Sequence, residues 1–184
     1  APSRGLGDVY KRQDELLMFA GFATVGDVMD LTGENRILVR EGLKRLQKTT
    51  HPGMSALIEA NELARDTLSA FHIGFVLGPC INASGRLATA KRALALLDTK
   101  DQALAIERAA ELKELNDERK ELTEQGLAQA VDLIEHSDLM EDRVLVVYLP
   151  DCHESLAGII AGRIRERYYR PVSVSYTHLT LPTK

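Results

Sequence analysis

The chain has 184 residues, of which 45% are hydrophobic and 27% charged, so it is long enough to bury a core in one or two domains. Its formal net charge is −4, and no uncharged apolar stretch approaches the roughly 20 residues that span a bilayer, which excludes a membrane protein and gives no sign of a signal peptide. The two cysteines, Cys80 and Cys152, are far apart in sequence, which excludes a disulfide framework and a CxxC motif and makes a reducing cytoplasm the expected compartment.

Both ends of the chain resemble translated sequencing adapter. Residues 8–13 (DVYKRQ) can be encoded by the mosaic end of transposase-made sequencing libraries, and residues 174–178 (VSYTH) fit its reverse complement in another frame. We therefore expect residues 1–13 and 174–184 to be adapter-derived tails with few contacts to the core, and the rest to be an internal segment of a longer gene. A tag-like tail with a chance match is the alternative. Without the tails, 26 acidic residues outnumber 19 basic ones, so a polyanion must be recognised by local basic clusters.

The first half of the sequence predicts helices separated by turns. Residues 14–23 are apolar enough for the end of a buried helix, and residues 24–31 read as a loop. Residues 35–46 combine apolar and basic side chains at helical spacing, which predicts an amphipathic helix. The glycines, proline and asparagine between residues 73 and 87 predict an irregular segment. Further helices are expected over residues 54–63, 66–71 and 87–97.

The second half predicts a long helix followed by alternating strand and helix. Residues 101–136 contain no proline and only one glycine, Gly126, with charges on most faces, which predicts one helix or two joined near that glycine. A polar helix of this length is typical of a connector between domains. Residues 143–149 (RVLVVYL) predict a buried strand, residues 155–169 a helix, and a second strand begins at residue 171. This order is typical of the start of an α/β domain.

Three motifs lie in order along these elements. Residues 23–31 (ATVGDVMDL), followed by TGENR, resemble the final aspartate motif of the DHH phosphoesterases. Residues 78–87 (GPCINASGRL) resemble the GPRxNAxGRL signature of RecJ-type members of that family, and residues 153–163 (HESLAGIIAGR) resemble the HEGxxGIxAxR opening of the associated DHHA1 domain. Together they make essentially all of residues 14–172 similar to the RecJ-type single-stranded-DNA-specific exonucleases.

The resemblance implies a fold and a domain organisation. The fold class is α/β overall but helix-rich in this chain. Residues 14–100 are expected to be the carboxyl-terminal part of a DHH domain, residues 101–138 a connector helix, and residues 139–173 the start of an α/β DHHA1 domain.

The resemblance also implies a function for the longer protein. It would be a metal-dependent exonuclease that acts on single-stranded DNA from the 5′ end in repair and recombination, with Mn²⁺ or Mg²⁺ as cofactor. A single-strand-binding protein and a helicase would be its protein partners. The earlier DHH motifs are not in this sequence, so the chain alone is expected to be inactive. The alternatives are a DHH-family phosphodiesterase acting on oligonucleotides or cyclic dinucleotides, and a noncatalytic nucleic-acid-binding relative.

Asp27, in the first motif, is the candidate metal ligand. A carboxylate is a hard oxygen ligand suited to Mn²⁺ or Mg²⁺, and paired metal ions activate water and stabilise charge in phosphodiester cleavage. From the residue type alone, capping of a helix would be the first interpretation of Asp27. The resemblance favours the metal. Asp30 matches no ligand of the family, so capping or turn chemistry is its expected role.

The loop predicted over residues 82–86 is the candidate nucleic-acid contact of the second motif. Gly85 permits close approach, and the amides of the following helix, together with the Arg86 guanidinium, can bind phosphate. The alternative is a structural turn with Asn82 bonded to its own backbone and Arg86 paired with a carboxylate. Both interpretations stay open for Asn82, and phosphate contact is favoured for Arg86. Cys80 replaces the usual arginine, which is expected to remove a cationic contact.

The last predicted helix and the residues beside it add further candidates for nucleic-acid contact. Arg163, Arg167 and Arg170 are spaced i, i+4 and i+7, so they form one basic stripe that can follow a phosphate backbone. A solvated surface face is an equal alternative. His153 is either a nucleic-acid contact or a cap of the turn. The assigned nucleic-acid-binding set is therefore Asn82, Arg86, His153, Arg163 and Arg167.

Overall fold

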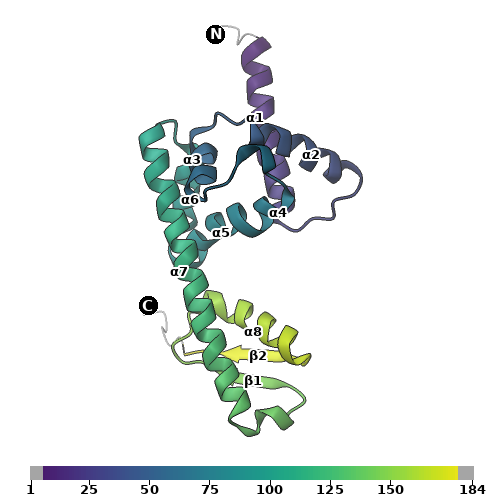
Figure 1. Cartoon of the computed structure of the whole chain (residues 1–184), viewed down its shortest axis with the longest axis vertical. Helices are drawn as coiled ribbons and strands as arrows, with labels where there is room; N and C mark the ends of the chain where they lie inside the picture. The colour runs from purple at the N-terminus through teal and green to yellow at the C-terminus, as the bar shows by residue number, and fades with distance from the viewer. Residues whose placement is uncertain (1–5, 178–184) are drawn as a thin grey trace, which may run out of the picture. The chain divides into compact units, whose positions relative to one another are not determined.

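The computed structural model describes the backbone of residues 6–177 and the side chains of residues 12–177 (Figure 1). The chain divides into two compact units, residues 1–116 and residues 117–184, so the division falls inside the predicted connector. Of the predicted tails, residues 1–5 and 178–184 lie outside the described residues. Over residues 6–177, every helix is too short or too polar to cross a membrane.

The first unit begins with two helices that cross at a pair of glycines. α1 covers Leu6–Gly26 and α2 covers Gly33–Gln47, which confirms the predicted amphipathic helix. A Cβ atom on Gly21 would lie 3.0 Å from the Cα of Gly42 and 2.8 Å from the carbonyl oxygen of Leu38. The absence of side chains at these two positions therefore lets the helix backbones touch.

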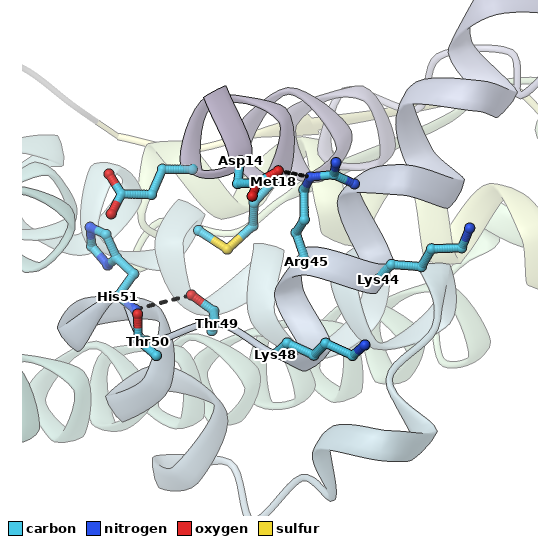
Figure 2. A pocket seen from close by; sticks show the side chains of 9 residues that line it. Asp14, Met18, Lys44, Arg45, Lys48, Thr49, Thr50 and His51 are labelled. Carbon is cyan, nitrogen blue, oxygen red and sulfur yellow. Dashed lines mark hydrogen bonds and ion pairs between the residues drawn. The ribbon is translucent and has the colours of Figure 1, made fainter. Parts of the chain in front are cut away.

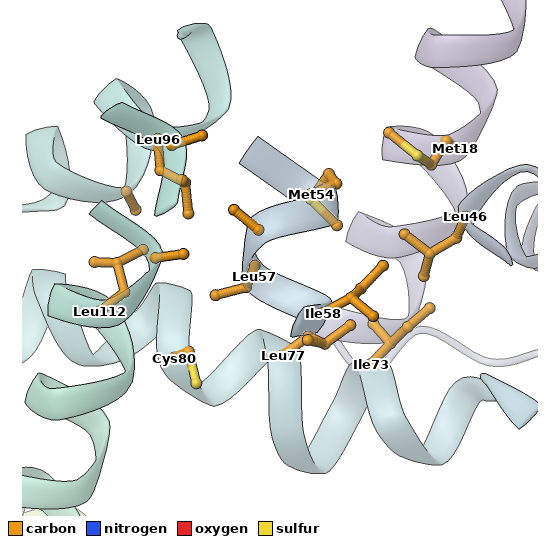
Figure 3. Packing of buried hydrophobic residues seen from close by; sticks show 14 of the residues in the cluster. Met18, Leu46, Met54, Leu57, Ile58, Ile73, Leu77, Cys80, Leu96 and Leu112 are labelled. Carbon is orange, nitrogen blue, oxygen red and sulfur yellow. The ribbon is translucent and has the colours of Figure 1, made fainter. Parts of the chain in front are cut away.

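The core of the first unit gathers around a short apolar helix. α3 covers Pro52–Ala60, and all its residues from Gly53 to Ile58 are buried. α6, Ala90–Asp98, and the first part of α7, Gln102–Glu135, pack on the same cluster. Figure 3 shows the largest members of this core: Met18, Leu46, Met54, Leu57, Ile58, Ile73, Leu77, Leu96 and Leu112.

The segment predicted to be irregular over residues 73–87 is helical, so that prediction is wrong. A short 3-10 helix, η1 (Arg65–Thr67), comes first. After two more residues, three helical segments begin that follow one another without a break. They are α4 (Ala70–His72), the π-helix η2 (Ile73–Leu77) and α5 (Gly78–Leu87).

Glycine and proline stand at positions of this run where a helix tolerates or needs them. Pro79 is the second residue of α5, directly after the π-helix, where the change in hydrogen-bond pattern accommodates a residue without an N–H. A Cβ on Gly78 would lie 2.7 Å from the carbonyl oxygen of Ile73, so glycine permits the close backbone of the π-helix. Sequence composition alone does not separate these uses from a loop.

The second unit is a strand, helix, strand arrangement beside the rest of α7. β1 (Leu145–Tyr148) follows the 3-10 helix η3 (Asp138–Glu141), α8 covers Glu154–Tyr168, and β2 covers Val172–Ser175. The two strands are parallel, in the register Leu145 to Val172. The helix-rich α/β fold is therefore confirmed.

The second core explains why Gly126 does not break the long helix. Its buried residues come from α7, β1, the residue after β1, and α8: Ala130, Ile134, Leu145, Val147, Leu149, Leu156, Ile160 and Ile164. A Cβ on Gly126 would lie 2.6 Å from the Cδ1 of Ile160. This glycine therefore marks a close approach of α8 to one continuous helix.

The strand β2 runs two residues into the predicted carboxyl-terminal tail. Val174 pairs with Val147 and packs partly against the second core, and the carbonyl oxygen of Ser175 accepts a hydrogen bond of 2.8 Å from the backbone of Leu149. The expectation of few core contacts is wrong for these two tail residues. Strand pairing uses backbone groups, which any residue except proline supplies, so a β-branched valine extends the strand. Tyr176, the next residue, is 37% exposed.

Candidate functional site

Asp27 lies immediately after α1, with an exposed side chain. The helix ends in a Schellman arrangement, in which the N–H of Val28 bonds to the oxygen of Val25 and the N–H of Met29 to the oxygen of Thr24, both at 3.1 Å. The position that normally takes glycine is Val28, with φ of +55°. The turn therefore fixes the backbone of Asp27 and leaves its carboxylate open to solvent.

The metal site implied by the motif is not complete in this chain. Within residues 12–177, no three His, Cys, Asp or Glu side chains are grouped so that they could hold a metal ion. Asp27 has the right chemistry for one oxygen ligand of Mn²⁺ or Mg²⁺, and the other ligands would have to come from outside this sequence. Asp30 has no capping role, because α2 begins after Thr32, and its backbone oxygen accepts a hydrogen bond of 3.0 Å from Asn35.

Asn82 and Arg86 lie on α5 and not in a loop, which corrects the local structure expected for them. They are four residues apart, so they share one face of the helix, and both side chains are exposed. Gly85 lies next to the start of α6, since its Cβ would be 3.8 Å from the Cβ of Ala90. Gly85, the neighbour of Arg86 on α5, therefore lies beside the first turn of α6.

Cys80 points into the protein instead of toward this face. It is completely buried in the first core, and its Sγ lies 3.5 Å from the Oδ1 of Asn61. An arginine at this position would have to extend from the interior to reach a substrate, and the loss of a cationic contact stays a prediction. Neither Cys80 nor Cys152 forms a disulfide.

His153 is the amino-terminal cap of α8. Its Nδ1 accepts a hydrogen bond of 3.3 Å from the backbone N–H of Ser155 and lies 2.8 Å from the Oγ of the same residue. Capping, one of the two roles that the sequence left open for His153, is therefore observed. Nucleic-acid contact by this residue stays a prediction.

Arg163 and Arg167 of α8, and Arg170 just after it, are engaged within the second unit. Arg163 pairs with Glu124, and Arg167 donates to Glu135 at 3.0 Å while its guanidinium lies 5.6 Å from the ring centroid of Tyr168. Arg170 donates to the backbone oxygens of Met140 and Asp142 at 2.6 and 3.0 Å. These contacts fasten α8 to α7 and η3. A DNA phosphate would have to replace carboxylates at Arg163 and Arg167.

A pocket of about 420 Å³ that the motifs do not predict lies beside α1 and α2 (Figure 2). Arg45 donates to Asp14 at 2.6 Å, and this hydrogen bond raises the pKa of Arg45. Glu41 accepts a hydrogen bond of 2.9 Å from Lys44, which lowers the pKa of Glu41. Two of the basic groups at the pocket are thus held by carboxylates. The lining consists of Asp14, Glu15, Met18, Lys44, Arg45, Lys48, Thr49, Thr50 and His51.

Comparison with known proteins gives a consistent answer. The chain is 40% identical over 163 residues to the single-stranded-DNA-specific exonuclease RecJ of Salmonella typhimurium, covering 86% of this chain and 28% of that protein. It is 39% identical over 153 residues to RecJ of Thermus thermophilus, covering 83% of this chain and 22% of the relative, and 34% identical over 161 residues to RecJ of Bacillus subtilis. No family model matches.

Solved structures agree with the sequence comparison. The crystal structure of RecJ from Thermus thermophilus in complex with Mg²⁺ superposes with a TM-score of 0.77 at 34% identity, covering 87% of this chain and 25% of that one. A structure of exonuclease RecJ bound to manganese gives a TM-score of 0.75 at 36% identity over 87% of this chain and 40% of that one. The chain spans about a quarter of the length of the relatives named above. Over most of its length, the chain matches a segment of RecJ-type proteins by sequence and by fold.

Proposed function

We propose that the protein to which this chain belongs is a metal-dependent exonuclease that degrades single-stranded DNA from its 5′ end in repair and recombination. The observation that carries the proposal is an exposed carboxylate, Asp27, at the end of α1, within a segment similar to RecJ exonucleases over most of its length. The solved relatives are complexes with Mg²⁺ or Mn²⁺, the ions that an aspartate oxygen suits.

Within such an enzyme, this chain would supply one metal ligand and a phosphate-binding face. The bound ions would activate water and stabilise charge at the scissile phosphate. Asp27 would hold its carboxylate toward them, since the turn after α1 fixes its backbone. Asn82 and Arg86 would orient the DNA backbone from α5, where both side chains reach solvent.

The second unit would contribute less to substrate binding. We retain His153, Arg163 and Arg167 as candidate DNA contacts because of the DHHA1-like motif. DNA binding there would cost the ion pairs of the two arginines with Glu124 and Glu135. The proposal extends to a single-strand-binding protein and a helicase as partners. It also extends to a cytoplasmic location, where cysteines outside disulfides are normal.

Replacement of Asp27 in the full-length protein tests the metal assignment. We expect Asp27→Ala to lower Mn²⁺-dependent hydrolysis of 5′-labelled single strands about 100-fold or more while leaving the melting temperature unchanged, because the side chain is exposed. Asp30→Ala is the matched control, three residues along the same exposed loop, and should retain activity. Wild-type turnover by Asp27→Ala would rule out the assignment.

A salt titration tests the phosphate contact of Arg86. If the guanidinium touches phosphate, Arg86→Ala should weaken binding of unrelated single strands equally and reduce the slope of log affinity against log salt by about 0.7. One phosphate contact displaces condensed cations but carries no base information. An unchanged slope combined with a lower melting temperature would show that Arg86 holds the helix and not the substrate.

A further inference from the structure

Two phenylalanine rings are stacked on the surface of the helical run formed by α4, η2 and α5. The centroids of Phe71 and Phe75 lie 4.9 Å apart with an interplanar angle of 27°. These residues are 61% and 71% exposed, although each ring would gain free energy by leaving water. A pair of exposed flat rings is suited to a ligand that also has a flat apolar face.

Buried side chains on the other side of the helical run hold the ring pair in place. Ile73 and Leu77, on the opposite side of the same helical run, are buried in the first core beside Ile58 (Figure 3). The His72 ring packs edge-on against Phe71 at 5.8 Å, and its Nδ1 accepts a hydrogen bond of 3.1 Å from the backbone of Ser69. The surface is therefore preorganised, which lowers the entropy cost of binding.

The two rings share one face of the helical run. Phe71 in α4 and Phe75 in η2 are four residues apart, a spacing that puts two side chains on the same side of a helix. A π segment is rare and often lies at a functional site. Here it carries one of the two rings.

The exposed side of this helical run carries both the two rings and the candidate phosphate contacts Asn82 and Arg86. The buried positions of the run are Ile73, Leu77, Gly78, Cys80, Ala83 and Ser84. The exposed positions on the other side are Phe71, Phe75, Asn82, Gly85 and Arg86. At 1.5 Å per residue, Phe75 and Arg86 are about 16 Å apart along the axis, a span of a few nucleotides. Apolar rings and a guanidinium therefore follow one side of the same helical run.

The rings also lie on an element that touches the helix of the metal-ligand candidate. A Cβ on Gly74 would be 3.7 Å from the Cγ1 of Val25, which is two residues before Asp27 in the last turn of α1. The segment between the two rings thus contacts the turn that carries the carboxylate.

We propose that Phe71 and Phe75 form a stacking platform for the bases of single-stranded DNA while Arg86 contacts its phosphates. This inference rests on the proposed function. Every base has a π face, so the platform is tolerant of sequence, and aromatic stacking with a basic track is the usual means of binding a single strand. Two rings are too small to be the main part of a protein interface, which buries about 800 Å² on each partner.

Fluorine NMR of the 184-residue chain tests the platform. The four phenylalanines are replaced by 4-fluorophenylalanine, and single Phe→Leu variants assign the resonances. The probes are a deoxyadenylate hexamer and a hexamer of the same charge in which all bases are missing. We expect the deoxyadenylate to shift the resonances of Phe71 and Phe75, and the abasic hexamer to leave them unchanged. Phe19 and Phe22, which pack against the first core, are internal references.

Affinity measurements at low salt complete the test. Phe71→Leu and Phe75→Leu keep an apolar side chain at the surface, so they should fold normally and bind the deoxyadenylate about tenfold more weakly or worse. Leu94→Ala, an exposed apolar change on α6, should bind as the unmodified chain does.

The possible outcomes separate the platform from the proposed function. Salt-dependent binding that needs Arg86 but leaves the Phe71 and Phe75 resonances unmoved would overturn the platform and leave the proposed function standing. Binding of neither hexamer would overturn the platform, and the proposed function would still be decided by Asp27→Ala in the full-length protein. Concentration-dependent shifts of these two resonances without DNA would identify a protein-binding surface and overturn the base-stacking assignment.

Discussion

Gly21 and Gly42 are in backbone contact where α1 crosses α2. A Cβ on Gly42 would lie 2.9 Å from the Cα of Gly21 and 2.9 Å from the carbonyl oxygen of Leu17, and neither atom belongs to a flexible side chain. Any side chain at Gly42 must therefore push the helices apart.

Gly42→Ala should consequently destabilise the first unit by about 2 kcal/mol, the usual cost of overpacking. Gly26→Ala is the control in α1, because a Cβ there would meet nothing within 4 Å. The free energy of unfolding in urea measures both changes. Equal stability of the two variants would mean that the helices do not cross at these glycines.

Val28 should be a strained residue that glycine relieves. Its φ of +55° belongs to the left-handed region, which a β-branched side chain disfavours. We expect Val28→Gly to raise the free energy of unfolding by about 1 kcal/mol, and Val28→Ala, which keeps a Cβ, to recover less than half of that. A loss of stability in Val28→Gly would argue that the side chain makes contacts that outweigh the strain.

The cap at His153 should contribute to the stability of α8. Removal of the acceptor in His153→Ala is expected to cost about 1 kcal/mol, and His153→Asn should restore most of it, since asparagine is a favoured cap. Thermal unfolding measures the loss. If His153→Ala instead weakens DNA binding at unchanged stability, the nucleic-acid interpretation of this residue is the correct one.

The ion pair between Arg163 and Glu124 should be weak. Their side chains are 41% and 63% exposed, so solvent screens the attraction. A double-mutant cycle with alanine at both positions should give a coupling of about 0.2–1 kcal/mol that decreases in high salt. A coupling that is large and independent of salt would contradict this surface assignment.

Cys152 should react slowly with alkylating reagents at neutral pH. Partial burial raises the pKa of its thiol above the ordinary value of 9.0, so the reactive thiolate is scarce until the pH rises past that value. Mass spectrometry after iodoacetamide treatment at pH 7.5 and pH 9.5 should show slow and then faster labelling. Fast labelling at pH 7.5 would show that the thiolate forms readily in the folded protein.

The sequence predicts the helices well where periodicity and charge agree. α2 and α7 follow from regular apolar spacing, and β1 from its run of β-branched residues. The run over residues 73–87 could not be predicted from composition, because a glycine that permits close backbone contact and a proline in a first turn use the same residue types as a loop.

The candidate site was only partly accessible from sequence. The candidates Asp27, Asn82 and Arg86 follow from short patterns with known chemistry, but the sequence does not predict the helix on which Asn82 and Arg86 lie. Phe71 and Phe75 are not predicted, since a phenylalanine in an apolar helix is ordinarily a core residue, and only the exposure of the two rings in the structure shows that they point outward.

The parallel pairing of β1 with β2 affects how the second unit behaves in concentrated solution. Strands of a parallel sheet are ordinarily covered on both faces, yet Val146 and Tyr148 are each 55% exposed on one face of β1. Within residues 6–177 the sheet has two strands, so each strand also has one edge without a partner strand, on which other chains can add by backbone pairing. Heating should therefore lead to intermolecular association that competes with refolding, and the apparent melting temperature of this unit will depend on scan rate and on protein concentration.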